Sequence, residues 1–150
     1  MKEIDTTACL TAMRELTEAG HTVSVQVSGN SMAPFLRHGR DIVWFKKPER
    51  PLRVGDVVFF CRTSGQFVLH RICRIRDGAY YIVGDNQTWI EGPVQAGQIF
   101  AVVVQVRRKG KILRPSHPLW CFFAVVWVRM IFARKFIAQL YRWMHKGEHT

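Results

Sequence analysis

Residues 67–83 read Phe-Val-Leu-His-Arg-Ile-Cys-Arg-Ile-Arg-Asp-Gly-Ala-Tyr-Tyr-Ile-Val, and this stretch decides the fold class. Two runs rich in β-branched and aromatic residues flank the dipeptide Asp77-Gly78. Asp-Gly is a strong signal for a two-residue hairpin turn, because both turn positions need a positive φ. The stretch therefore predicts two antiparallel strands, Phe67–Ile75 and Ala79–Val83.

The same turn sets a register in which Arg76 pairs with Ala79. Continued along the hairpin, this register places His70 opposite Asp85, with Cβ atoms about 4.5–5.5 Å apart. An imidazole and a carboxylate could bond at that distance, but a slip of one residue would remove the pairing. On the pairing alone, an edge-strand histidine beside an ordinary Asp85-Asn86 turn is an equally good interpretation.

Further runs of strand-forming residues lie on both sides of this hairpin and are separated by turn-rich segments. A helix is predicted over Thr7–Ala19, where apolar residues recur at helical spacing before Gly20. Many short strands without alternating helices indicate a mainly β class, namely a small antiparallel, partly closed β domain. The further predicted strands are Thr22–Val27, Asp41–Phe45, Asp56–Phe60 and Ile99–Val106.

Length and composition limit the organisation of the chain. Its 150 residues suit one domain, and we divide them into an N-terminal helix (1–21), a β domain (22–114) and a basic C-terminal helix (115–150). The four cysteines form no C-x-x-C pair, so we predict neither a metal site nor a disulfide framework, and no motif indicates a cofactor. The first residues lack the apolar run of a signal or anchor segment, which predicts a catalytic part in the cytoplasm.

The positive charge is concentrated at the C-terminal end. Residues 105–150 carry 10 of the 22 basic side chains and one of the 11 acidic ones. An apolar run over 118–128 is interrupted by Arg129 and is too short to cross a bilayer, which needs about 20 residues. From Met130 onward, helical spacing predicts an interfacial helix on a membrane surface, although packing on the domain or on a second copy is the alternative. Its basic side has Arg134, Lys135, Gln139, Arg142 and His145, and its apolar side has Phe132, Phe136, Leu140, Trp143 and Met144.

A serine follows the first predicted strand, in the turn Ser28-Gly29-Asn30-Ser31. A serine hydroxyl becomes a good nucleophile when a base takes its proton, and a histidine oriented by a carboxylate is the common device. The chain contains these parts. By itself, however, Ser-Gly-Asn-Ser is also an ordinary turn sequence.

Four short motifs in a fixed order resemble the type I signal peptidases and, more distantly, LexA-like peptidases. They are Ser28-Gly29-Asn30-Ser31-Met32-Ala33-Pro34-Phe35-Leu36, then Arg53-Val54-Gly55-Asp56-Val57-Val58-Phe59, then Val68-Leu69-His70-Arg71-Ile72, then Gly84-Asp85-Asn86. Relatives with a lysine base are common, but the matching position here is a histidine, as in the endoplasmic-reticulum and spore-former branch. The resemblance implies Ser31 as the nucleophile and His70 as the general base.

The remaining parts of the site are less defined by the resemblance. It implies Asp85 as the supporting acid, with Glu91 as the alternative, because relatives can use an acid a few residues later. The backbone N–H of Ser31 is the natural oxyanion donor, and the turn beginning at Ser28 is a candidate for the second. The chain departs from the family at Gly39-Arg40-Asp41, where relatives usually have Gly-Asp.

Two classes of function compete. The first, which we favour, is a membrane-associated serine endopeptidase at the cytoplasmic face that cleaves a precursor or a leader-type or signal-type peptide. The second is a non-enzymatic basic module that binds a membrane or nucleic acid, although no pattern of exposed aromatics supports nucleic acid. Self-cleavage of a regulator is a third interpretation, but the short N-terminal segment has no obvious DNA-binding domain.

Overall fold

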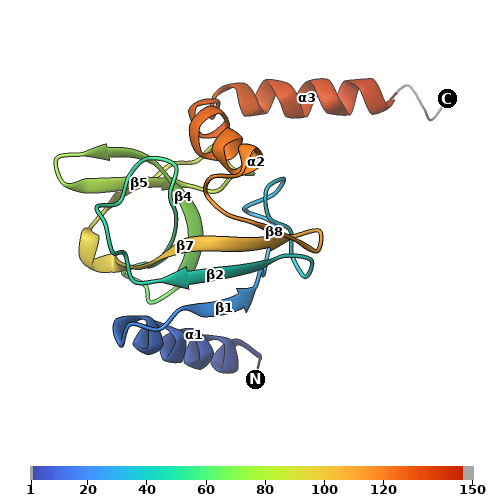
Figure 1. Ribbon diagram of the computed structural model, residues 1–150. Coiled ribbons are helices and arrows are strands. Elements are labelled where there is room, and N and C mark those ends of the chain that lie inside the picture. The colour runs from blue at the N-terminus through green and yellow to red at the C-terminus, as the bar shows by residue number, and fades with distance from the viewer. Residues whose placement is uncertain (1, 147–150) are drawn as a thin grey trace.

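The computed structural model describes residues 2–146 and centres on an eight-stranded antiparallel sheet (Figure 1). The strand order is β1-β2-β7-β3-β4-β5-β6, and β8 pairs with β7. The sheet does not close, since β1 and β6 remain at its edges, and the predicted mainly β class is confirmed. The strands are β1 (Val23–Gln26), β2 (Ile42–Lys46), β3 (Val57–Cys61), β4 (Phe67–Arg76), β5 (Ala79–Val83), β6 (Glu91–Val94), β7 (Ile99–Arg108) and β8 (Lys111–Leu113).

Strand β3 carries the centre of the core. Its residues 57–60 are all buried, because the strand lies between β4 and β7 and is covered on both faces. One face belongs to a cluster that includes Phe59, Phe35 and Trp120, and the other to a cluster that includes Phe60, Ile72 and Ile82. Helix α1 (Lys2–Glu18) packs near β1 and β7, below the sheet in Figure 1. The predicted N-terminal helix is therefore present.

The β4–β5 hairpin forms around the predicted turn but does not keep the predicted register. Asp77 and Gly78 both have positive φ, and Arg76 pairs with Ala79. A bulge at Cys73 then shifts the register by one residue, so that Ile72 pairs with Ile82. An extra residue on one strand of an antiparallel pair has this effect. The predicted pairing of His70 with Asp85 is therefore wrong.

The chain after β8 first packs into the body and then leaves it. Helix α2 (Pro118–Cys121), the π-helical turn η2 (Phe122–Val126) and the 3-10 turn η3 (Trp127–Arg129) follow one another. Trp120 and Phe123 are buried against Phe35, with ring centroids 5.7 and 4.9 Å away. Trp120, Phe123 and Val128 of the apolar run over 118–128 are therefore core residues, whereas Phe122, Val125 and Val126 are exposed. Among residues 2–146, no helix is long and apolar enough to cross a membrane.

Helix α3 (Ala133–His145) projects beyond the sheet at the top of Figure 1 and separates an apolar side from a polar side, as predicted. The five residues of the apolar side are 55–87 % exposed, and we call them the apolar stripe: Phe132, Phe136, Leu140, Trp143 and Met144. Arg134 departs from the prediction of an exposed basic side, because it is buried against the body. The side chain of His145 lies outside the described residues.

Candidate active site

The loop between β1 and β2 carries Ser31, and a buried carboxylate holds its far end. Asp41 accepts hydrogen bonds from the amides of Arg37 and Lys109, at 2.8 and 3.1 Å. The Arg40 guanidinium adds two bonds of 2.8 Å. Burial acts to raise the pKa of Asp41, but these bonds outweigh it and hold the pKa below its ordinary value. The acid in Gly39-Arg40-Asp41 therefore ties the serine loop to the β7–β8 turn.

The backbone of Ser31 packs against the segment that follows β5. The Asn86 amide donates to the Ser31 carbonyl at 2.9 Å, and Asn86 Nδ2 donates to the Asn30 carbonyl at 3.3 Å. A Cβ atom added to Gly84 would lie 2.5 Å from the Ser31 carbonyl oxygen. Only glycine permits this close approach of two backbones, which explains the glycine of the Gly84-Asp85-Asn86 motif.

Gly84 also relates Ser31 to His70. Val83 pairs with Arg71, so the next residue along this strand, Gly84, lies opposite His70. Opposed residues of an antiparallel pair point to the same face of the sheet, and the Cβ position of Gly84 points at Ser31. The Ser31 backbone thus lies beside Gly84, the residue opposite His70, whereas Met32, Phe35 and Leu36 of the same loop pack in the Phe59 cluster on the other face of the sheet. No hydrogen bond joins Ser31 to His70 among residues 2–146; catalytic contacts are often long before substrate binds.

His70 is buried, with 4 % of its surface exposed, and its ring lies 6.4 Å from that of Phe60. Burial lowers the pKa of His70 to about 4; the charge of Arg62 adds to this lowering, and the charge of Glu91 opposes it. The imidazole is therefore neutral at pH 7, which is the form that a general base needs.

An ion pair lies on the same face as His70. Glu91 pairs with Ile82, and Ile82 pairs with Ile72, two residues along the strand from His70, so these side chains share one face. Arg62 donates to the Glu91 carboxylate through Nε, at 3.0 and 3.1 Å, and through Nη2, at 2.7 Å. Of the two acids named from the sequence, Glu91 is the one whose charge acts on His70.

Asp85 has a different partner. Its carboxylate accepts two bonds of 2.8 Å from Nε and Nη2 of Arg71, and both side chains are fully buried. Arg71 follows His70 in β4, and adjacent residues of a strand point to opposite faces. The bulge at Cys73 is the physical reason that Asp85 meets Arg71 and not His70. Sequence reasoning missed this pair, although an arginine within an apolar strand needs a buried partner.

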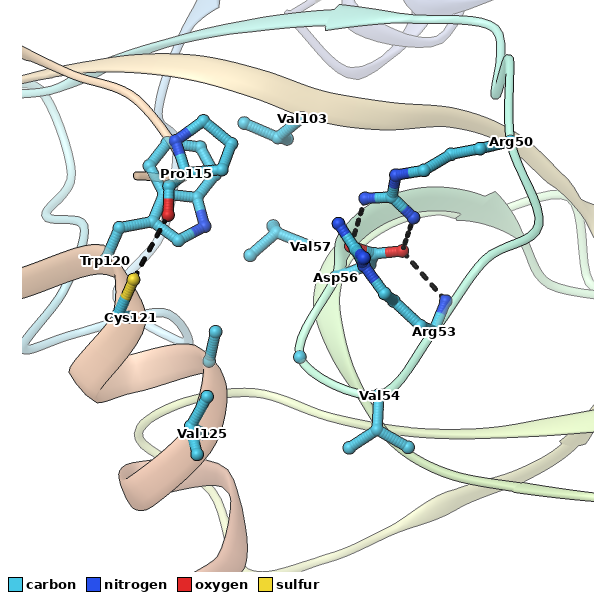
Figure 2. Close-up of a pocket in the computed structure, with 12 residues that line it drawn as sticks. Arg50, Arg53, Val54, Asp56, Val57, Val103, Pro115, Trp120, Cys121 and Val125 are labelled. Atoms are coloured by element: carbon cyan, nitrogen blue, oxygen red, sulfur yellow. Dashed lines mark hydrogen bonds and ion pairs between the residues drawn. The ribbon is translucent and has the colours of Figure 1, made fainter. Parts of the chain in front are cut away.

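The Arg53-Val54-Gly55-Asp56 motif supports the same pair from the other side. Arg71 Nη1 donates to the Gly55 carbonyl at 2.8 Å. Asp56 accepts from Nη1 and Nη2 of Arg50, at 3.0 and 2.9 Å, and from the Arg53 amide at 2.9 Å, as Figure 2 shows. A cavity of about 320 Å³ lies between this turn and helix α2, and neither catalytic candidate lines it.

The backbone amides of Ser28 and Ser31 are the predicted oxyanion donors. Gly29 donates its N–H to Nδ1 of His38 at 2.8 Å. The amides of Ser28 and Ser31 have no acceptor among the described residues, so their role as oxyanion donors stays a prediction. No group of three His, Cys, Asp or Glu side chains that could hold a metal occurs within residues 2–146.

The chain combines an antiparallel β domain, a serine in the loop after β1 and a buried, neutral histidine in β4, and a serine with a base is the pair that serine hydrolases use. The sequence model of the Peptidase S24-like family matches residues 2–106, more than half of the chain. The chain therefore belongs to this family, within the superfamily of LexA-like and signal peptidase-like proteins. No curated protein and no solved structure matches the chain.

Proposed function

We propose that the protein is a serine endopeptidase in which Ser31 is the nucleophile and His70 the general base. The observation that carries this proposal is the contact of the Ser31 backbone with Gly84, the residue opposite His70. Through this contact, a loop and a strand far apart in sequence would supply one site. The substrate would be a peptide or protein precursor, and the signal peptidase-like motifs favour a leader-type or signal-type peptide.

In this mechanism, the Ser31 hydroxyl oxygen attacks the carbonyl carbon of the scissile peptide bond while His70 takes its proton. The amides of Ser31 and Ser28 bind the oxyanion that forms. The C–N bond breaks as His70 returns the proton to the leaving amine, and water then hydrolyses the acyl-enzyme. Glu91 is the better supporting acid, because its charge acts on His70, whereas Asp85 is buried with Arg71.

Replacement of Ser31 by alanine should lower cleavage by a factor on the order of 10³ or more, since no other nucleophile replaces the hydroxyl. The matched control is Ser24→Ala, which changes an exposed serine on β1. We would compare precursor N-termini by proteomics in cells that carry wild type, Ser31→Ala or Ser24→Ala. Equal thermal unfolding of the purified variants would show that the fold is intact.

Precursor N-termini that are identical in wild type and Ser31→Ala would rule out the peptidase and favour the non-enzymatic module. Incubation of wild-type protein with Ser31→Ala protein separates two forms of the proposed activity. Cleavage of the inactive copy would indicate a self-processing regulator. Cleavage of other precursors alone would indicate an enzyme acting in trans.

We also propose that α3 places the protein on a membrane surface rich in anionic lipids, at the cytoplasmic face. The apolar stripe is exposed, and Trp and Phe side chains suit the boundary between headgroups and acyl chains. Lys135 and Arg142 are exposed on the same helix and would attract anionic headgroups.

A further inference from the structure

An open cleft of about 760 Å³ lies between the serine loop and helix α3. Ala33 and Pro34 line it from the serine loop, and Asn86 and Thr88 line it from the segment after β5. The side of α3 that faces away from the apolar stripe forms the opposite wall, and no residue of the stripe lines the cleft.

Neither Ser31 nor His70 lines the cleft, but two of its lining residues adjoin Ser31. Ala33 stands two residues after Ser31, and Asn86 donates its amide to the Ser31 carbonyl at 2.9 Å. A peptide bound at Ser31 could therefore extend from the serine loop into the cleft. There it would contact α3, which lies outside the family match that ends at residue 106.

Helix α3 is bonded to the active-site segment, so the cleft has a fixed wall. Arg134 donates Nη1 to the carbonyls of Gly84 and Gln87, at 3.0 and 2.9 Å, and Nη2 to the Trp127 carbonyl at 2.9 Å. Trp127 in turn donates its indole N–H to the Asp85 carbonyl at 2.9 Å. The wall of the cleft and the segment that holds Ser31 are thus one bonded unit.

The lining of the cleft is strongly positive. Arg37, Lys135 and Arg142 are exposed there, and none of the three forms an ion pair with a described residue. Arg134 adds a fourth positive charge, and its buried Nε is a donor with no acceptor in the described chain. The one carboxylate of the lining, Asp85, is already bonded to Arg71. The positive charges of the cleft therefore have no carboxylate to pair with in the described part of the chain, and an acidic ligand could supply one.

We infer that the cleft binds an acidic segment of the substrate, within a few residues of the scissile bond. This inference rests on the proposed peptidase function and adds a determinant of specificity to it. Carboxylates of the segment would meet the exposed cations, while Ile137 and Tyr141 offer apolar contact to the side chains between them. Positive charge next to the site also speeds the approach of an acidic peptide.

Binding can be measured without cleavage by using the Ser31→Ala protein. The probes are a labelled peptide of alternating Glu and Ala residues and its twin with Gln in place of Glu, followed by fluorescence anisotropy. The test variant adds Lys135→Glu and Arg142→Glu. The matched control adds Arg107→Glu and Lys111→Glu, which make the same change of charge at exposed positions outside the cleft.

We expect the Glu peptide to bind about five- to tenfold more tightly than its Gln twin, as two partly exposed charge pairs allow. The test variant should lose this preference and the control should keep it. Added salt should weaken the preference, because exposed charges are screened over about 8 Å. Equal binding of the two peptides, or equal loss in test and control variants, would overturn the inference.

Further outcomes distinguish the acidic-segment inference from the peptidase proposal and from lipid binding. If active protein cleaves Glu and Gln versions of a precursor with equal kcat/KM, the peptidase stands and the acidic-segment inference fails. If no precursor is cleaved, the peptidase proposal fails, while the anisotropy result still decides whether the cleft binds acidic peptide. Loss of binding to phosphatidylglycerol vesicles in the test variant, with no effect on either peptide, would assign the cleft to lipid headgroups and overturn the inference.

Discussion

At the scale of single residues, the burial of His70 makes its protonation a direct probe of the site. Its pKa of about 4 predicts that kcat/KM stays constant from neutral pH down to about pH 5 and then falls, because protonated imidazole cannot accept the Ser31 proton. Glu91→Gln should move this fall to lower pH, since it removes the one nearby charge that raises the pKa of His70. A pH–rate profile of wild type and Glu91→Gln would measure both effects.

The lowered pKa of His70 also makes the free energy of unfolding depend on pH. This dependence tests the pKa without a substrate. The unfolded chain binds a proton at His70 near pH 6.5, whereas the folded chain does so only near pH 4. Stability from this group is therefore present above pH 6.5 and is lost as the pH falls toward 4, by up to about 3 kcal/mol. Urea unfolding of His70→Gln should lack this dependence. A wild-type slope equal to that of the variant would show that His70 titrates normally.

The candidate catalytic residues differ in how well the sequence predicts their surroundings. Local motifs predict Ser31 and His70, and in the structure the Ser31 backbone approaches Gly84, the residue opposite His70. Asp85 was assigned to His70 by counting along a regular hairpin, and one unpaired residue, Cys73, made that count wrong. A bulge depends on packing across the sheet, so nothing in the local sequence marks it. The catalytic roles themselves stay predictions.

At the scale of elements, a single buried arginine couples α3 to the active-site segment. Arg134→Met should release the three carbonyls that it bonds and lower the free energy of unfolding by roughly 2 kcal/mol. Hydrogen exchange should become faster at the Asn86 amide, which bonds Ser31. The matched control is Arg142→Met, because the hydrogen bond of Arg142 among the described residues is to Ala138 of its own helix. Equal exchange in both variants would show that Arg134 does not order this segment.

The strands differ in how clearly the local sequence predicts them. The hairpin around Asp77-Gly78 combines strand-forming residues with a defined turn, and the ends of its two strands were predicted to within one residue. The short strands β6 and β8 were missed, because Glu91–Val94 contains glycine and proline and Lys111–Leu113 has only three residues. Pairing with a neighbouring strand orders them, and that information lies elsewhere in the chain.

At the scale of the whole molecule, the apolar stripe and the exposed cations of α3 predict attachment to anionic vesicles. The full chain should float with vesicles that contain phosphatidylglycerol and should be only partly released by salt, because salt screens charge but leaves apolar burial intact. Phe136→Ser with Trp143→Ser should abolish flotation, since both side chains are exposed and contribute nothing to the core. The control is Trp89→Ser, an exposed tryptophan outside α3.

Flotation that is unchanged in the Phe136/Trp143 variant would contradict attachment through α3. Loss of flotation in Trp89→Ser to the same extent would place the contact elsewhere on the surface. Size-exclusion chromatography of the same proteins would detect the remaining alternative, in which the stripe of one copy packs on another. A dimer that the variant converts to a monomer would favour that alternative over the membrane.

The position of β7 in the sheet has a consequence for biosynthesis. β7 lies between β2 and β3, yet it follows both in the chain and ends at Arg108. Until the ribosome has made β7, the strands β1 and β2 can form one part of the sheet and β3 to β6 another, but no strand joins the two parts. The apolar edge of β3 stays unpaired for that time, and such edges invite association between nascent chains. Translation must therefore reach the end of β7 before the two parts can become one sheet.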